Sequence, residues 1–471
     1  MQQLPYNNRR ALALIPLMLF LFSCVTYNQR IADYYAAMRN NNYAAAEATL
    51  EKTKILQAKR NRLLYLFEKG KMAHLMKQYD SSNRYFNEAD IFMEDVRTSA
   101  TDLALGTLLN PMMQTYKGEA FEKFMLHYYK ALNYLYLGKP NDALVEARRI
   151  SLSTYELQDK TKSDNKYNDD AFSLMMQGII YQQNDDWNNA FIAYRNSVDL
   201  FLKNNNSYYG VSIPQQLKQD LLRAADKTGF TDELGRYEKL MNTSYQKYPD
   251  PPGGELVLFW ENGLAPVKEE QNFFFALTKD GLGNFAFVDP TGSFNIPFNF
   301  SSYNINSADL RLADLRSFRV AFPRYVEQPM YFRNATVTID NQKYSLEQAQ
   351  NINTLAFTTL RERFLKEMST ALARLVVKKL AEMAARPKSD DKNKDTKEAI
   401  ALAIQAFSFA TEKADTRNWQ SLPHTIYYTR IPLRKGTNQL QFQANGPSSQ
   451  TINLVVEGRG GQQVQNIVTL R

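Results

Sequence analysis

The sequence predicts a multidomain α+β protein, in which a stack of helical hairpins is followed by a β-rich, sandwich-like domain with a helical insert. Two patterns lead to this prediction. Small and large apolar residues recur at fixed offsets in the first half, and short apolar runs between Gly and Pro turns fill the second half. A chain of 471 residues also exceeds one typical domain of about 150 residues. We therefore expect at least two domains.

Residues 1–23 have the features of a secretory signal peptide. Two arginines precede an apolar run at 11–22, which is shorter than the ~20 residues needed to span a bilayer. The run ends in a segment that resembles the bacterial lipobox, with cleavage expected between Ser23 and Cys24. Cys24 is the only cysteine, so it has no internal disulfide partner. We expect lipid on Cys24 to anchor the chain; the alternative is a stray thiol in the signal.

Residues 24–248 carry a repeated helical pattern. Three stretches share one register of small and large residues around polar turns, and their members include Gly70, Tyr79, Phe86 and Ala89, then Ala131, Tyr134 and Ala143, then Gly178, Tyr181, Ala190 and Tyr194. A weaker copy lies at 34–50, and a fifth hairpin is expected at 214–248 with its turn at Gly229. The pattern resembles the tetratricopeptide repeat, a helix–turn–helix unit of about 34 residues. We therefore predict a tetratricopeptide-like α-solenoid.

Stacked helical hairpins leave a curved surface that suits an extended peptide or protein segment. We therefore expect a protein partner on the concave face of the repeats. The alternative is a stack that packs only against its own C-terminal domain.

The pattern changes at 249–254, where three prolines and two glycines mark a boundary. We assign 255–471 to the β-rich domain, with expected strands at 255–260, 273–278, 284–288, 318–322, 335–339, 425–431, 440–443, 452–456 and 464–470. Apolar residues at helical spacing predict an insert at 353–414, made of helices 353–386 and 398–414. We expect this insert to pack on the β core; the alternative is an amphipathic element lying on a membrane.

Two motifs in the second half carry a family resemblance: one begins with Glu261, Asn262 and Gly263, and the other contains Asp415, Arg417, Trp419 and Pro423. Through them the whole chain resembles an uncharacterised family of bacterial outer-membrane lipoproteins that join tetratricopeptide-like repeats to a β-rich C-terminal domain. Some members are encoded beside activators of penicillin-binding proteins. The resemblance implies an outer-membrane location, facing the periplasm, and it implies no known activity.

The roles of the two motifs stay open at this point. Asp415 is expected to cap backbone amides or to pair with Arg417. Trp419 either stacks on a sugar ring or fills the core, and Glu261-Asn262-Gly263 reads as a strand end with a turn. A structural role is the favoured interpretation for both motifs.

Composition argues against an enzyme. The three histidines His74, His127 and His424 lack metal-ligand spacing, and no nucleophile elbow, phosphate loop or dinucleotide fingerprint is present. We expect no cofactor, no metal and no nucleic acid. Removing the two arginines of the signal lowers the net charge from +8 to +6, which suits anionic envelope polymers or lipid headgroups, or is simply a mildly basic surface.

We therefore predict a lipid-anchored periplasmic scaffold that binds a protein partner, possibly in cell-envelope or peptidoglycan assembly. The main alternative is a glycan- or lipid-binding module that uses Trp260 or Trp419, with peptidoglycan as one ligand. A glycan-acting enzyme, working through two carboxylates that the sequence does not identify, is the third hypothesis.

Overall fold

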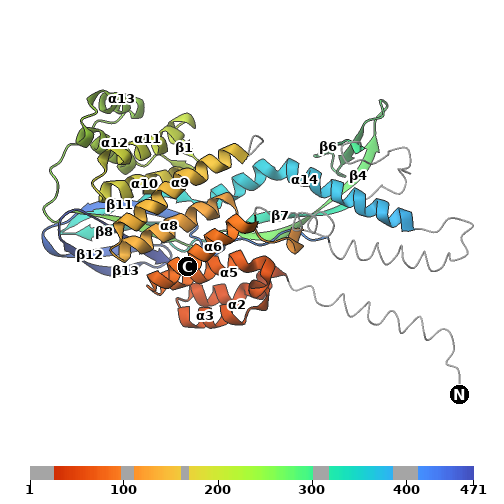
Figure 1. The fold of residues 1–471 in the computed structure, drawn as a ribbon, viewed down its shortest axis with the longest axis horizontal. Helices are drawn as coiled ribbons and strands as arrows, with labels where there is room; N and C mark the ends of the chain where they lie inside the picture. Colours follow the sequence, from red (N-terminus) through yellow and green to blue (C-terminus); the bar gives the residue numbers. More distant parts are fainter. Residues whose placement is uncertain (1–25, 97–110, 161–168, 301–317, 386–411) are drawn as a thin grey trace, which may run out of the picture.

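The computed structural model describes residues 26–96, 111–160, 169–300, 318–385 and 412–471. Helices fill the first half of the described chain and strands fill most of the second, which confirms the α+β class (Figure 1). Ser23, Cys24 and the rest of the expected signal lie outside the described residues. So does 398–411, most of the second helix predicted for the insert.

Five helical hairpins are present in the described part of the first half. They are α2 (Tyr27–Arg39) with α3 (Tyr43–Lys52), α5 (Arg62–Leu75) with α6 (Tyr79–Val96), α8 (Ala120–Tyr136) with α9 (Pro140–Lys160), α10 (Ala171–Gln183) with α11 (Trp187–Lys203), and α12 (Gln215–Thr228) with α13 (Thr231–Met241). The short elements between them are α4 (Lys54–Gln57), η1 (Lys59–Asn61), η2 (Pro111–Met113), β1 (Ser207–Tyr208) and β2 (Val211–Ser212). Each hairpin packs on the next, so the helices form one stack (Figure 1).

The recurring small residues are explained by the contact between the two helices of a hairpin. A Cβ added at Gly70 would lie 2.5 Å from the ring of Phe86, and one at Gly178 would lie 2.5 Å from the ring of Tyr194. Each aromatic residue lies 16 positions after its glycine, so in both hairpins a ring of the second helix fills the space beside a glycine of the first. At these two positions the first helix has room for no side chain larger than that of glycine.

In the described residues, β1 pairs with β2, and β3 to β14 form three four-stranded sheets. The first has the order β10 (Glu347–Asn351), β11 (Thr425–Pro432), β3 (Glu255–Asn262) and β14 (Gln462–Thr469). The second has the order β13 (Gln450–Gly458), β12 (Gly436–Asn445), β8 (Asn334–Ile339) and β9 (Gln342–Ser345). The third has the order β6 (Asn295–Phe298), β5 (Phe285–Val288), β4 (Val267–Lys279) and β7 (Phe318–Val326).

Strand β3 is buried on both faces, which explains its continuous apolar run. Leu256, Leu258 and Trp260 join the apolar core between the first and second sheets. Val257 and Phe259 belong instead to the core shared with the helices. The first sheet is thus the middle layer, with helices on one side and the second sheet on the other.

The long helix α14 (Ile352–Ala385) runs beside β7 and extends away from the stack (Figure 1). Its start agrees with the first predicted helix of the insert. The second predicted helix extends too far, because Glu412, Lys413 and Ala414 are not helical. Glu412 instead pairs with Arg374 and Lys378 of α14, at 2.7 and 3.2 Å, so these two cations serve an internal contact.

Sequence patterns missed β1, β2, β6, β9 and β10, and they did not indicate that β14 pairs in parallel with β3. These are short strands or long-range pairings that carry little local signal. None of the helices in the described residues combines the length and the hydrophobicity that a membrane span requires.

Candidate functional site: the interface between helices and sheet

The first helices of the middle hairpins face the first sheet, and three clusters of mostly buried polar side chains cross this interface within the described residues. We name them the Glu261 cluster, the Glu122 cluster and the Arg430 cluster, after one central residue of each. The protein's own sheet therefore covers this inner face of the repeats. The expectation that the concave face of the repeats is free to bind a partner is wrong. The alternative, that this face packs against the C-terminal domain, describes the structure.

The Glu261 cluster joins the end of β3 to helices α5 and α8. The carboxylate of Glu261 accepts hydrogen bonds from Lys71 Nζ and from the hydroxyl of Tyr129 at 2.7 Å, and both charged side chains are fully buried. Asn466 of β14 donates to the other carboxylate oxygen at 2.6 Å and also contacts His74 Nε2 at 3.1 Å. One strand end is thus tied to two helices and to the neighbouring strand.

Burial and the neighbouring charges shift the pKa values in this cluster. Burial acts to raise the pKa of Glu261, but Lys71 and the Tyr129 hydroxyl outweigh it, and the net shift is downward. Burial lowers the pKa of Lys71, and the Glu261 charge acts against that shift. Burial, together with the Lys71 charge, lowers the pKa of His74 to about 4. Glu261 is therefore ionised and His74 is neutral at pH 7.

The Glu122 cluster lies at the start of α8. The Glu122 carboxylate accepts hydrogen bonds from the Trp419 backbone N–H at 2.7 Å, the Tyr116 hydroxyl at 2.6 Å and the Glu119 backbone N–H at 2.9 Å. Glu119 itself pairs with Lys268 of β4 and, at 2.8 Å, with Arg363 of α14. Three parts of the chain thus converge on the first turn of one helix.

The two carboxyl groups of this cluster differ in their ionisation. Burial acts to raise the pKa of Glu119, but Lys268 and Arg363 reverse that effect and lower it. Burial and the nearby Glu119 charge raise the pKa of Glu122 to about 7. Glu122 therefore titrates near neutral pH.

The second motif is a structural clamp. Arg417 forms a two-pronged ion pair with Asp415, at 2.8 and 2.7 Å, and donates to Asn61 at 2.8 Å and to the Gln114 carbonyl at 2.9 Å. This agrees with the expected pairing of Asp415 and Arg417. Trp419 is fully buried and stacks on Phe67 with ring centroids 4.3 Å apart. Sugar stacking by Trp419 is therefore ruled out for this conformation.

The two motifs also lie against each other. Asn418 donates to the Pro266 carbonyl at 2.8 Å, and the Ala265 N–H donates to the Leu422 carbonyl at 2.7 Å. Gly263 has a φ of 70°, a left-handed conformation that favours glycine. Its N–H donates to the Thr469 carbonyl at 2.7 Å.

The remaining motif residues lie in the interior. Asn262 donates to the Phe332 carbonyl at 2.7 Å, and Pro423 is buried. Trp260 is fully buried and donates to Thr469 Oγ1 at 2.9 Å, so the glycan-stacking role expected for it is also wrong.

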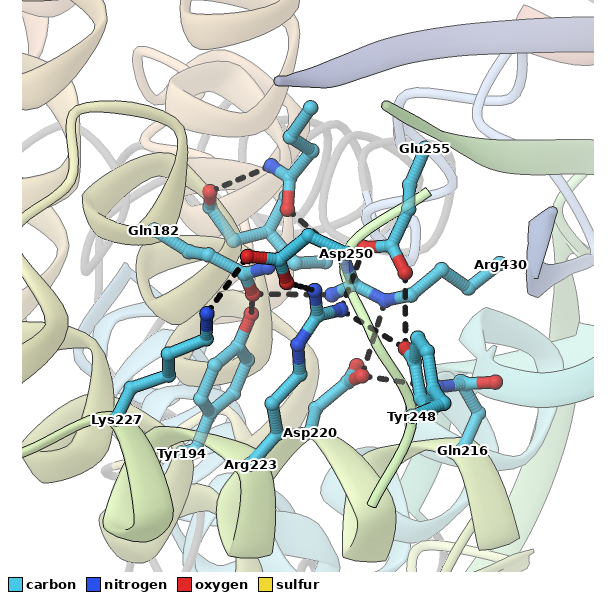
Figure 2. A network of polar contacts seen from close by, with 12 residues as sticks. Gln182, Tyr194, Gln216, Asp220, Arg223, Lys227, Tyr248, Asp250, Glu255 and Arg430 are labelled. Atoms are coloured by element: carbon cyan, nitrogen blue, oxygen red, sulfur yellow. Dashed lines mark hydrogen bonds and ion pairs between the residues drawn. The ribbon is translucent and has the colours of Figure 1, made fainter. Parts of the chain in front are cut away.

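The Arg430 cluster holds the last hairpin to the sheet (Figure 2). Arg430 of β11 pairs with Asp220 of α12 at 3.0 Å and with Glu255 of β3 at 3.1 Å. Arg223 of α12 reaches the same Glu255 at 2.6 Å and pairs with Asp250 at 2.8 Å. Arg430 also donates to Gln182 of α10 at 3.1 Å, so two hairpins and two strands share one cluster.

These clusters are better explained as contacts that hold the helices to the sheet than as a reaction centre. Most of their charged groups are buried and paired with one another, and the polar cavity lined by Asn41 and Arg471 lies elsewhere. Among the described residues, no group of three His, Cys, Asp or Glu side chains is arranged to hold a metal ion. The three histidines each bond to neighbours: His74 to Asn133, His127 to Glu146 and His424 to Glu327.

Sequence reasoning found Glu261, Asp415, Arg417 and Trp419 but missed the residues that meet them. Lys71, Glu122 and Asn466 lie far from these motifs in the chain and belong to no recognised motif. One signal was available: α5 carries Glu68, Lys69, Lys71 and His74 within seven residues, directly after the apolar run 63–67, and all four are buried. Charged residues in such a helix indicate buried partners.

No protein-family model matches the chain, and no curated protein matches it either. Among solved structures, RapI in its apo form aligns with a TM-score of 0.32 and 15% identity, over 46% of this chain and 71% of that chain. MamA aligns with a TM-score of 0.27 and 14% identity, over 46% of this chain and 92% of that chain. A Podosopora anserina kinesin light chain with nearly identical TPR-like repeats aligns with a TM-score of 0.30 and 14% identity, again over 46% of this chain and 92% of that chain. Similarity at this level carries no conclusion about function, and the hairpins described above stand on this structure alone.

Proposed function

We propose that the protein is a non-enzymatic scaffold of the bacterial envelope, anchored by lipid on Cys24, that binds a protein partner through the outer surface of its helical stack. The observation that carries this proposal is the sealed inner face. Buried ion pairs hold the hairpins to the sheet, so the stack is a rigid platform and the second helices α6, α9 and α11 are left facing outward.

The outward helices carry exposed apolar side chains that suit a protein partner. Ile91 of α6, Val145 of α9 and Ile192 of α11 are 61%, 47% and 37% exposed. Val145 and Ile192 occupy the same repeat position, five residues after the first residue of their helices. Adjacent hairpins therefore present equivalent apolar positions, as a surface used for recognition would.

Photo-crosslinking in cells tests the partner. A photoreactive residue at Val145 or Ile192 should give a discrete protein adduct. Val455 of β13 is an exposed valine on the opposite domain, 68% exposed, and is the matched control. Adducts at Val455 alone, or at none of the three positions, would contradict the proposed binding face.

Membrane fractionation tests the anchor separately. Cys24→Ala removes the thioether that would carry the lipid, so the variant should leave the membrane fraction. One acyl chain binds a membrane only marginally, whereas the several chains of a mature lipoprotein hold firmly. A variant that still fractionates with membranes would show that the signal was misinterpreted.

One observation favours glycan binding as a second candidate. A polar cavity of about 410 Å³ lies between the end of β14, the start of β13 and the α2–α3 turn, and its lining includes Asn41, Tyr331, Ser448, Gln450 and Arg471. Hydroxyl, amide and aromatic groups are the ones that sugars use. Tyr331→Ala should weaken co-sedimentation with purified peptidoglycan, and equal sedimentation of variant and wild type would remove this candidate.

A further inference from the structure

The folded body begins almost at the expected lipid anchor. Thr26 caps α2: its hydroxyl accepts from the Gln29 N–H at 3.3 Å, and Gln29 Oε1 accepts from the Thr26 N–H at 2.9 Å. Cys24 stands two positions before Thr26, and two residues span at most about 7 Å. Little chain therefore separates a lipid on Cys24 from the first helix.

The start of α2 is also fixed to the rest of the molecule. Tyr27 is buried. Asn28 donates to the Lys268 carbonyl at 2.6 Å, and its own side-chain oxygen accepts from Gln420 at 2.8 Å. An anchor at Cys24 would therefore hold the whole body in one restricted position against the bilayer.

A basic segment lies beside this point. Residues 52–62 contain Lys52, Lys54, Lys59, Arg60 and Arg62 and no acidic residue. The three lysines are exposed. Among the ion pairs of the described residues, Arg62 is used, with Glu88, but the three lysines are not. These three charges are directed to solvent or to an external anion.

The basic segment lies beside the start of α2. Helices α2 and α3 pack against each other as one hairpin, so the end of α3 at Lys52 lies next to the first turn of α2. At the other end of the segment, Asn61 of η1 accepts from the Arg417 guanidinium, and the Arg60 carbonyl accepts from the Tyr116 N–H at 2.8 Å. In Figure 1, α2, α3 and α5 accordingly lie together at one end of the stack.

We propose that residues 52–62 form a membrane-facing surface that binds anionic phospholipid headgroups and orients the body on the bilayer. This inference rests on the lipid anchor of the proposed function. A basic cluster beside a lipid anchor supplies a second membrane signal, and each cation near an anionic surface strengthens binding by roughly fivefold. The outward surface of α9 and α11 would then be held at a fixed orientation for its partner.

Lysine labelling on vesicles tests the surface. The full-length lipidated protein is reconstituted in phosphatidylcholine vesicles with or without 30% phosphatidylglycerol, and lysine acetylation is read by mass spectrometry. Lys52, Lys54 and Lys59 should lose about fivefold of their reactivity when phosphatidylglycerol is present. Lys239 of α13, at the far end of the stack, should not change.

Two failures are distinguishable. A protein that floats with neither vesicle contradicts the anchor and this inference together. A protein that floats, but whose three lysines react equally in both vesicles, contradicts this inference alone.

A variant pair gives an independent check. The triple variant Lys52→Gln, Lys54→Gln and Lys59→Gln changes only exposed side chains and should still float. In the wild type, phosphatidylglycerol should slow hydrogen exchange at 53–61. In the triple variant this slowing should be lost. The matched control, Lys203→Gln, Lys239→Gln and Lys343→Gln, removes three exposed charges elsewhere and should keep that slowing. Equal slowing in both variants would overturn the proposal.

Discussion

The inner and outer sides of the helical stack use charge in opposite ways. On the inner side, Lys71 and Glu261 pair with no exposure to solvent and share the site with tyrosine hydroxyls. On the outer side, Arg62 and Glu88 pair at 2.8 Å with nearly half of each side chain exposed. The inner pair ties distant parts of the chain together, whereas the outer pair links neighbouring helices of one hairpin.

This difference separates stability from recognition. A buried ion pair is costly to break because the remaining charge has no water to solvate it. An exposed pair contributes little, since water and salt screen it. The inner face thus stabilises the contact between the two halves. Residues on the outer face contribute little to stability, so they can be substituted to suit a partner.

The largest expected effect is on the inner pair. Glu261→Gln keeps the side-chain shape but leaves the Lys71 ammonium buried without its counter-charge, so we expect a loss of about 3–5 kcal/mol in the free energy of unfolding. The shift of the urea denaturation midpoint measures this loss. The double variant Lys71→Met, Glu261→Gln removes both charges and should recover a large part of it.

The matched outer change is Glu88→Gln. It removes the partner of Arg62 at an exposed site, and we expect a change below about 1 kcal/mol. Equal losses at Glu261 and Glu88 would break the comparison, because they would mean that burial does not decide the strength of these pairs.

The sequence predicted one side of this interface better than the other. The repeat register located Gly70 and Gly178, because helix–helix contacts within a hairpin are local and leave a periodic pattern. The turn at Gly229 followed in the same way, and the residue has the left-handed conformation expected of a helix end. The motifs around Glu261 and Trp419 were visible, but their partners were not. Lys71 and Asn466 are 190 and 205 residues from Glu261, and pairing over such separations leaves no periodic trace in one sequence.

The second expected effect is that the Glu122 cluster and the Glu261 cluster, which contains His74, change stability with pH in opposite directions. The pKa of Glu122 rises from its usual value near 4.5 to about 7 on folding, so its contribution to stability is complete below pH 4.5 and is lost as the pH rises to 7. The pKa of His74 falls from 6.5 to about 4, so its contribution is complete above pH 6.5 and is lost as the pH falls to 4. Each amounts to about 3 kcal/mol, and the two nearly cancel.

Glu122→Gln removes the Glu122 contribution, so the opposite pH dependence of stability that His74 causes becomes measurable. In this variant, stability should fall as the pH drops from 6.5 toward 4, and the difference from wild type should grow by about 3 kcal/mol between pH 7 and 4.5. Urea midpoints measured at intervals across that range give both profiles. Two parallel profiles would show that folding does not raise the pKa of Glu122.

The remaining comparison contrasts two helix glycines, one inside the stack and one at its outer end. Gly178 faces the ring of the fully buried Tyr194, so Gly178→Ala must displace that ring and should cost about 1–3 kcal/mol. Gly235 of α13 has nothing within 4 Å of an added Cβ, so Gly235→Ala should gain about 0.5–1 kcal/mol from helix propensity. Thermal melts of the two variants should shift in opposite directions. A shift of the same sign in both would mean that the close approach of α10 and α11 does not require a glycine, and that the repeat register has another cause.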